Sequence, residues 1–257
     1  MSAAGPAWLT PAWPAPARVR AAATLRGGGV SPAPYATLNL GTHVGDDPAA
    51  VAENRRRLAE ALALPAEPLW LSQVHGTGVI DADARRVTGA PTPAGAPPQA
   101  DAAVARAPGQ PLVILVADCL PVLFASDDGA VIGIAHAGWR GLAAGVLEAT
   151  VAALGQPPAQ LHTWVGPGIG PAHFEVGDEV RVALCSQDPG AAEAFQPNPR
   201  GRWQCDLQRL TRRRLAHLGI QSVHGQPRCT FAEPDAFFSY RRDGVTGRMA
   251  ALIWLEA

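Results

Sequence analysis

Cysteine and histidine stand beside three short apolar segments, in a pattern that suits nucleophilic or metal chemistry. Cys119 and His136 follow two of these segments, and His75 follows a third, next to Gly76 and Gly78. A thiol and an imidazole can act as a nucleophile with its base, or both can bind one metal ion. The linear order does not show that the three side chains meet, so both kinds of chemistry stay open at this point.

Asp118 places a carboxylate directly before the cysteine. Such a group can position a water molecule or orient an imidazole such as that of His136, and it can also cap a turn. Cys119, His136 and Asp118 are therefore the candidate catalytic residues. Downstream of His136, Gly138 and Gly141 allow close backbone approach where a helix is expected to begin.

Apolar segments of strand length must position these side chains. Several of them are continuous rather than alternating, which is typical of strands covered on both faces. The block 112–151 is predicted to run strand, turn, strand, turn, helix, with Pro121 preventing the first strand from continuing. The predicted strand segments are 19–25, 69–74, 102–105, 112–117, 130–135, 161–166 and 249–255.

Helical periodicity occurs at 48–63, at 142–154 and in a third helix that Asp206 caps and that extends to Leu218. Strands mixed with helices at irregular spacing favour a mixed α/β or α+β fold with layered sheets. The stretch 88–99 is rich in glycine and proline and is predicted to be a surface loop.

Composition narrows the possible functions. The 257 residues are 47% hydrophobic and 17% charged, enough to build one large domain or two small ones. A formal net charge of −1 gives no broad positive electrostatic field that could attract nucleic acid or an anionic membrane. Small-molecule chemistry is therefore favoured. All 21 basic residues are arginine. Schiff-base catalysis, pyridoxal phosphate anchoring and the P-loop are excluded because each needs a lysine.

No apolar run approaches the roughly 20 residues of a transmembrane helix, and residues 1–16 lack the basic start of a signal peptide. We therefore expect a cytoplasmic protein with neither nucleic-acid nor membrane partners. The four cysteines lie far apart with no C-x-x-C pair, which argues against a disulfide framework or a zinc ribbon.

Several motifs together resemble the YfiH family, also called laccase-domain or multicopper polyphenol oxidase proteins. The family includes peptidoglycan editing factors and purine nucleoside phosphorylases. The likeness extends from about residue 17 to residue 255, with the motifs in family order and spacing. The motifs are SQVHG at 72–76, ADCLPV at 117–122, HAGWRG at 136–141, GPGIGP at 166–171, FEVG at 174–177, FFSYRRDG at 237–244 and TGRMA at 246–250.

The resemblance implies a single catalytic domain over residues 1–257, with a four-layer α/β/β/α sandwich similar to cytotoxic necrotizing factor toxins. It also implies a zinc ion held by His75, Cys119 and His136. Three protein ligands leave the fourth tetrahedral position open, as in catalytic zinc sites.

On the substrate side, the segments 38–47 and 53–62 resemble those that contact substrate in the family. Asn39 and Arg55 are carried over as substrate or phosphate contacts, because a guanidinium suits a bidentate oxyanion. Gln73 is predicted to bind a base or amide. His43, Tyr240 and Arg241 are weaker candidates for the same pocket.

The activity that the resemblance implies is a zinc-dependent purine nucleoside phosphorylase acting on adenosine, inosine or methylthioadenosine, with adenosine deamination as a second reaction. One alternative is an amidase that edits UDP-muramoyl-L-serine peptidoglycan precursors, with Cys119 as nucleophile. Another is a copper polyphenol oxidase (laccase), with Met249 as an axial ligand; the absence of His-x-His pairs disfavours this reading. A further alternative is a non-catalytic protein with a structural zinc ion. Such an ion needs a fourth ligand, which could be Cys185, Cys205 or Cys229.

Overall fold

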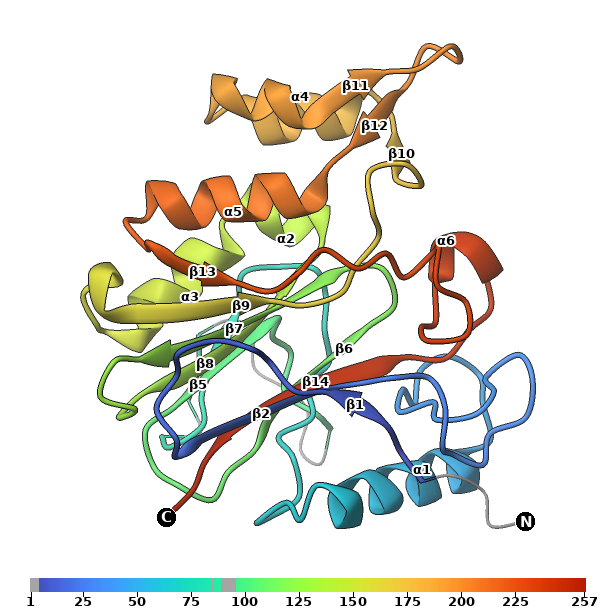
Figure 1. Cartoon of the computed structure of the whole chain (residues 1–257), viewed down its shortest axis with the longest axis vertical. Coiled ribbons are helices and arrows are strands. Elements are labelled where there is room, and N and C mark those ends of the chain that lie inside the picture. Colours follow the sequence, from blue (N-terminus) through green and yellow to red (C-terminus); the bar gives the residue numbers. More distant parts are fainter. Residues whose placement is uncertain (1–4, 85, 89–95) are drawn as a thin grey trace.

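The computed structural model describes residues 5–84, 86–88 and 96–257. Within them, two main sheets lie against each other, with strand orders β1-β2-β14-β6 and β13-β9-β7-β8-β5-β3-β4, and a small sheet β10-β12-β11 stands apart (Figure 1). The strands are β1 Trp8–Leu9, β2 Val19–Thr24, β3 Val79–Asp81, β4 Arg86–Thr88, β5 Ala102–Ala105, β6 Leu112–Val116, β7 Leu120–Ser126, β8 Ile132–Ala137, β9 Leu161–Val165, β10 Glu175–Val176, β11 Phe195–Pro197, β12 Trp203–Cys205, β13 Ser222–His224 and β14 Met249–Leu255. The helices are α1 Pro48–Ala61, α2 Trp139–Ala144, α3 Val146–Leu154, α4 Asp178–Cys185, α5 Leu207–His217 and α6 Tyr240–Asp243, with short 3-10 turns at Pro158–Gln160 and Pro189–Ala194.

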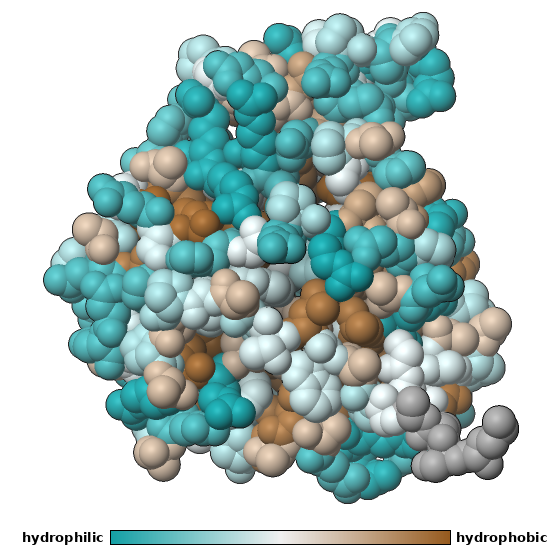
Figure 2. All heavy atoms as spheres, in the orientation of Figure 1, coloured by the Kyte–Doolittle hydropathy of each residue, from teal (hydrophilic) through white to brown (hydrophobic). Residues whose placement is uncertain are grey.

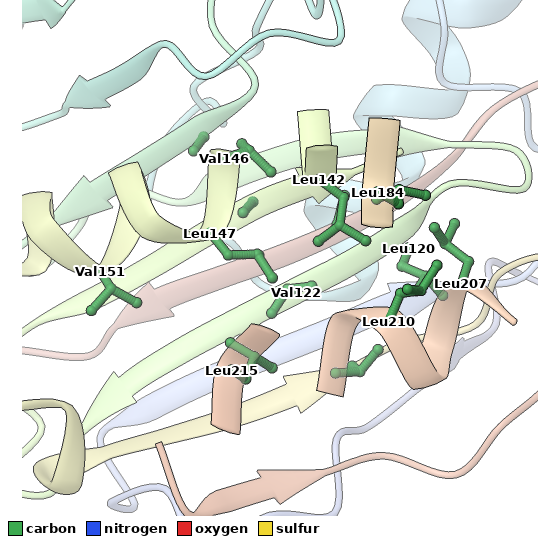
Figure 3. Close-up of a cluster of buried hydrophobic side chains, with 14 of the residues drawn as sticks. Leu120, Val122, Leu142, Val146, Leu147, Val151, Leu184, Leu207, Leu210 and Leu215 are labelled. Atoms are coloured by element: carbon green, nitrogen blue, oxygen red, sulfur yellow. The ribbon is translucent and has the colours of Figure 1, made fainter. Parts of the chain in front are cut away.

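Helices cover the outer face of each main sheet, so the predicted four-layer α/β/β/α sandwich is confirmed (Figure 1). Helix α1 packs Leu58 against Leu252 of the smaller sheet. Helices α2, α3 and α5 pack against the larger sheet, and Figure 3 shows their leucines meeting Leu120 and Val122 of β7. Side chains such as those of Ile134 and Ile253 fill the space between the two sheets. Burial of these apolar faces stabilises the layers.

Five of the predicted strands are confirmed almost to the residue: β2, β5, β6, β9 and β14. The continuous burial of β5, β6 and β14 reflects sheets that are covered on both faces. The predicted strand at 69–74 is wrong, since this segment makes only isolated bridges at Leu69 and Ser72. It runs beside the edge strand β6, where the side-chain amide of Gln73 bonds the backbone of Leu115.

The block 112–151 contains three strands rather than the predicted two. Strand β6 ends in the smaller sheet, and the chain crosses at residues 117–119 into β7 of the larger sheet. Asp118 makes this crossing with a positive φ of 95°. Pro121 therefore does not exclude a strand; it is the second residue of the central strand β7, where the missing N–H is tolerated.

The helix predicted at 48–63 is confirmed as α1, and Asp206 caps α5 by accepting a hydrogen bond from the backbone N–H of Arg209 at 2.9 Å. The helix predicted at 142–154 begins earlier and is broken into α2 and α3. Gly145 adopts a φ of 99° between them, a conformation that glycine takes without strain. The sequence patterns did not indicate α4, which lies with β10–β12 in the upper part of Figure 1.

In the described part of the chain, no helix is long and apolar enough to cross a membrane. Hydrophilic side chains cover most of the face shown in Figure 2, with smaller hydrophobic patches between them. Most of the loop predicted at 88–99 falls on residues 89–95, outside the described residues.

Candidate metal centre

The structure brings His75, Cys119 and His136 together, although 61 residues separate the first from the last. Their ligand atoms all lie within 4.8 Å of one another. The Sγ of Cys119 is 4.0 Å from Nε2 of His75, and the two imidazole rings have centroids 4.8 Å apart and planes 69° apart. Three donors at this spacing can converge on one ion.

Each donor comes from a different kind of local structure. His136 is the fifth residue of β8, and only 3% of the surface of this residue is exposed. Cys119 directly precedes β7, on the crossing between the sheets. The sequence pattern predicted His75 at the end of a strand. In the structure His75 lies in a loop and has a positive φ of 60°. The loop needs a specific support to hold this uncommon backbone conformation.

Asp101 provides that support. Its fully buried carboxylate accepts hydrogen bonds from the backbone N–H groups of Val74, His75 and Gly76 at 2.7–3.1 Å. The same carboxylate bonds Nδ1 of His136 at 2.9 Å. Two of the three donors are thus held by one side chain, and Nε2 of His136 is left to face the other donors. Asp101, rather than the predicted Asp118, orients His136.

Gly138 lets the donors approach each other. A Cβ atom at this position would lie 2.8 Å from Sγ of Cys119 and 3.2 Å from Cδ2 of His75. The first distance is shorter than van der Waals contact permits, so any larger residue would push the thiol or the backbone away. The glycine of the HAGWRG motif therefore belongs to the construction of the site.

The thiol and imidazole form an electrostatic pair. Burial favours the neutral thiol, but the charge on His136 and hydrogen bonds from His136 and His75 outweigh it and lower the pKa of Cys119 to about 6. Burial likewise opposes the charged imidazole, yet the Cys119 thiolate and Asp101 raise the pKa of His136 to about 9. The donor set thus favours the thiolate at neutral pH, and the thiolate is the form that binds metals.

The donors lie in the wall of a cavity of about 560 Å³. Three arginines and a histidine also line it: Arg140, Arg241, Arg248 and His43. Burial and the neighbouring Arg248 and Arg55 charges lower the pKa of His43, which favours its neutral form at pH 7. This cationic wall, in the same cavity as a metal-binding corner, suits an anionic or strongly polar small molecule. The remaining lining residues are Gln73, Leu115, Ala117, Asp118, Ile169, Phe174 and Tyr240.

Asp118 lines this cavity, but both of its carboxylate oxygens have partners. Oδ1 accepts a hydrogen bond from the Thr230 hydroxyl at 2.6 Å, and Oδ2 accepts one from the backbone N–H of Arg241 at 2.7 Å. Asp118 therefore ties α6, which carries Tyr240 and Arg241, to the cysteine turn. Tyr240 itself is 60% exposed.

Three residues predicted to contact substrate also make firm internal bonds. Asn39 is fully buried, and its amide bonds Gly41, Asp46 and the backbone N–H of Arg248. Arg55 donates two hydrogen bonds to the carbonyl of Leu40 and stacks on Trp70 at 3.5 Å from the ring centroid.

Neither Asn39 nor Arg55 lines the cavity, whereas Gln73 does while bonding Leu115. Asn39 instead supports the backbone from which Arg248 enters the cavity. Substrate contacts by these three side chains stay predictions.

Asp101, Arg140 and Arg248 belong to the site but were not among the residues predicted from the sequence. Arg140 and Arg248 stand inside the HAGWRG and TGRMA motifs, so attention to charged residues within those motifs would have selected them. Asp101 had a different signal: a charged residue directly before the apolar run Ala102–Ala105. A carboxylate at such a place is buried only when it is paired or hydrogen-bonded.

The donor set matches an open metal site better than a closed one. Among the described residues, the group of His75, Cys119 and His136 contains no fourth histidine, cysteine or carboxylate. The sulfur of Met249 accepts a hydrogen bond from the backbone N–H of Phe238 at 3.0 Å and does not line the cavity. Two imidazoles and one thiolate are typical zinc ligands, with one tetrahedral position left for another molecule.

These features define a class of protein: a two-sheet α/β/β/α sandwich with a two-histidine, one-cysteine metal corner in a cationic cavity. Residues 20–256 match the family described as multi-copper polyphenol oxidoreductase laccase, and the chain belongs to this family, as the YfiH resemblance predicted.

A purine nucleoside phosphorylase of Pseudomonas aeruginosa is 54% identical over 252 residues, covering 97% of this chain and 99% of the relative. Purine nucleoside phosphorylase YfiH of Escherichia coli is 47% identical over 247 residues, covering 96% and 98%.

Solved structures of similar proteins share the whole architecture. A Neisseria meningitidis protein superposes with a TM-score of 0.90 at 46% identity, covering 97% of this chain and 99% of that one. The YfiH protein of Bacillus licheniformis gives a TM-score of 0.85 at 32% identity, covering 93% of each chain.

Proposed function

We propose that this protein is a zinc-dependent purine nucleoside phosphorylase that acts on adenosine, inosine or methylthioadenosine. The observation that carries the proposal is the convergence of His75, Cys119 and His136 in a cavity that three arginines also line. The activity named for the Pseudomonas and Escherichia relatives supports it, because both match nearly the full length of this chain.

In the phosphorolysis reaction, a phosphate oxygen forms a bond to the anomeric carbon of ribose while the bond from that carbon to the purine nitrogen breaks. Arg248 and Arg140 hold the phosphate, because guanidinium groups pair well with oxyanions. The purine nitrogen takes up, as it leaves, the proton that hydrogen phosphate loses when its oxygen bonds to the sugar. Phe174, Ile169 and Tyr240 offer apolar surface to the flat base.

His75, Cys119 and His136 would hold the zinc ion, which supplies Lewis acidity when bound. Asp101 fixes the tautomer and direction of His136 and keeps the loop of His75 in place. Asp118 keeps α6 beside the cavity through its bond to the backbone of Arg241. The chain thus contributes a fixed donor set and a cationic phosphate site.

The test is to incubate zinc-loaded protein with adenosine and phosphate and to separate the products by chromatography. Adenine and ribose 1-phosphate are expected, and they should depend on phosphate. Inosine and ammonia formed without phosphate would instead reveal the predicted deaminase reaction. If neither product exceeds that of a Cys119→Ala variant, the proposal is wrong.

An amidase with Cys119 as nucleophile and His136 as its base is the second candidate, because the charge and hydrogen bond of His136 outweigh burial and lower the pKa of the thiol to about 6. In that reaction Cys119 would attack the amide of a UDP-muramoyl-L-serine precursor. Mass spectrometry of the products from this precursor and from its alanine counterpart tests the candidate. Release of serine but not alanine would support it, and no release from either would remove it.

We further propose that residues 1–257 form one catalytic domain, working in the cytoplasm on small molecules. The family match over 20–256 and a formal net charge of −1, which attracts neither nucleic acid nor anionic membranes, support this view.

A further inference from the structure

A second cluster of reactive side chains lies on the strands β9 and β13, outside the lining of the metal cavity. His162 and Ser222 are direct neighbours in the parallel pairing of these strands, and their Nδ1 and Oγ atoms are 2.7 Å apart. Nε2 of His162 is 3.0 Å from Oδ1 of Asp127. On the other side of the serine, Nε2 of His224 is 2.8 Å from Oγ. His162, Ser222 and His224 are thus linked by two hydrogen bonds, and Asp127 lies within ion-pairing distance of the imidazole of His162.

The chemistry of these groups fixes the direction of proton donation when His162 is neutral. The nearby ionised carboxylate of Asp127 has no proton to donate, so it favours the His162 tautomer that carries its proton on Nε2. Nδ1 then carries a lone pair and accepts the hydroxyl proton of Ser222. Burial and the charge of Arg212 lower the pKa of His224, so its neutral ring donates from Nε2 to the serine oxygen. The serine hydroxyl therefore points at a base that is itself oriented by a carboxylate.

Local backbone contacts hold the cluster in place. The Thr163 hydroxyl donates to the carbonyl of Ser222 at 3.1 Å, which fixes β13 against β9. The backbone N–H of Asp127 donates to the carbonyl of Gln160 at 2.9 Å, which fixes the turn after β7 beside the start of β9. The three elements are long-range neighbours, and β13 and β9 lie side by side in Figure 1.

We propose that Ser222 is an activated nucleophile with His162 as its base and Asp127 as the group that orients the base. The arrangement has the order of contacts found in serine hydrolases: carboxylate to imidazole, imidazole to hydroxyl. The side chains of Asp127 and His162 are 53% and 19% exposed, so small reagents reach the cluster from solvent. The substrate class is small activated acyl compounds, such as aryl esters, because solvent rather than an enclosed pocket would surround the reacting carbonyl.

Hydrolysis of an aryl ester at Ser222 needs no reactant other than water. Oγ of Ser222 forms a bond to the acyl carbon, its proton moves to Nδ1 of His162, and the aryl oxide leaves, taking up that proton. Water then attacks the acyl-serine with His162 again as base, which releases the carboxylic acid and restores the serine. A fluorophosphonate follows only the first step: the oxygen-phosphorus bond forms, the phosphorus-fluorine bond breaks, and the product is stable.

The experiment treats the full-length, zinc-loaded protein with a fluorophosphonate probe and locates the label by peptide mass spectrometry. One label per chain on Ser222 is expected. Ser222→Ala should abolish it, and His162→Gln should slow it by roughly 100-fold or more, as removal of a general base does. Asp127→Asn, on an exposed turn, should also slow labelling without changing the sheet.

Ser186→Ala is the matched control. Ser186 is an exposed serine whose hydroxyl donates to the carbonyl of Ala183 and not to a histidine, so its loss should leave labelling unchanged. Absence of label on Ser222 in the folded protein would overturn the proposal. Equal labelling rates in the parent protein and in His162→Gln would overturn it as well, because the serine would then not be activated. Phosphorolysis should continue in Ser222→Ala, since none of these residues lines the metal cavity.

Discussion

The two sides of the cavity are built in different ways. The metal corner stands on the larger sheet, where His136 is 3% exposed and its partner Asp101 is fully buried. The arginine wall takes its guanidinium groups from helix starts and the segment before β14, and the lining includes Tyr240, which is 60% exposed. Preorganised donors keep a metal ion in one geometry, whereas long side chains on short elements can adjust to a substrate. We therefore expect substitutions in the corner to affect metal binding and substitutions in the wall to affect substrate binding.

The largest effect is expected from Cys119→Ala, which removes one of three donors and the only thiolate in the group. Zinc affinity should fall by more than the roughly 10–100-fold that loss of a supporting contact costs. Phosphorolysis should fall to background. Equilibrium dialysis with zinc, followed by elemental analysis, measures the first effect. Retention of one tightly bound zinc per chain would show that the corner is not the metal site.

Asp101→Asn should have the next largest effect, although Asp101 is not itself a donor. The variant keeps the size of the side chain but removes the charge that pairs with His136 and accepts from three backbone N–H groups. Zinc affinity should fall by about 10–100-fold. The matched control is Asp81→Asn, an aspartate that pairs with Arg106 outside the cavity. Equal zinc affinity in Asp101→Asn and the parent protein would mean that the corner holds its shape without this carboxylate.

Arg248→Ala tests the other half of the comparison. The guanidinium lines the cavity and should bind phosphate, so its loss should raise the KM for phosphate about 10–100-fold, the value of one or two charge-assisted hydrogen bonds. Zinc content should stay at the level of the parent protein. Arg242→Ala, which removes an arginine bonded to the carbonyls of Thr230, Phe231 and Phe237, is the control for general damage near α6. An unchanged phosphate KM with reduced zinc content would reverse the assignment of the two sides.

The same division explains what could be predicted from the sequence. Cys119 and His136 flank apolar strands, so their types and places pointed to a site, and continuous apolar runs indicated the buried strands. The role of Asp101 could not be predicted in this way, because its four hydrogen bonds join segments that meet only after both sheets are packed. Asn39 and Arg55 show the opposite situation. Their place in segments that resemble the family predicted substrate contacts, whereas in the structure both side chains bond to the backbone, which the sequence alone does not show.

The smallest effect concerns the metal-free protein and its stability against pH. The pKa of Cys119 is lowered to about 6, so the stability from its thiolate is present at high pH and is lost as pH falls through about 6. The pKa of His136 is raised to about 9, so the stability from its charge is present at low pH and is lost as pH rises through about 9. Because the two groups stabilise each other, the melting temperature should be highest between these values.

Thermal unfolding of the chelator-treated protein across pH 5 to 10 measures this effect, with Cys119→Ser as the matched variant. The serine hydroxyl does not ionise in this range, so the part of the pH profile that depends on the pair should flatten. The other titrating groups remain, and subtraction of the two profiles isolates the pair. Parallel profiles would mean that the thiol and imidazole are both neutral in the metal-free corner, and its preorganisation would then rest on Asp101 and Gly138 alone.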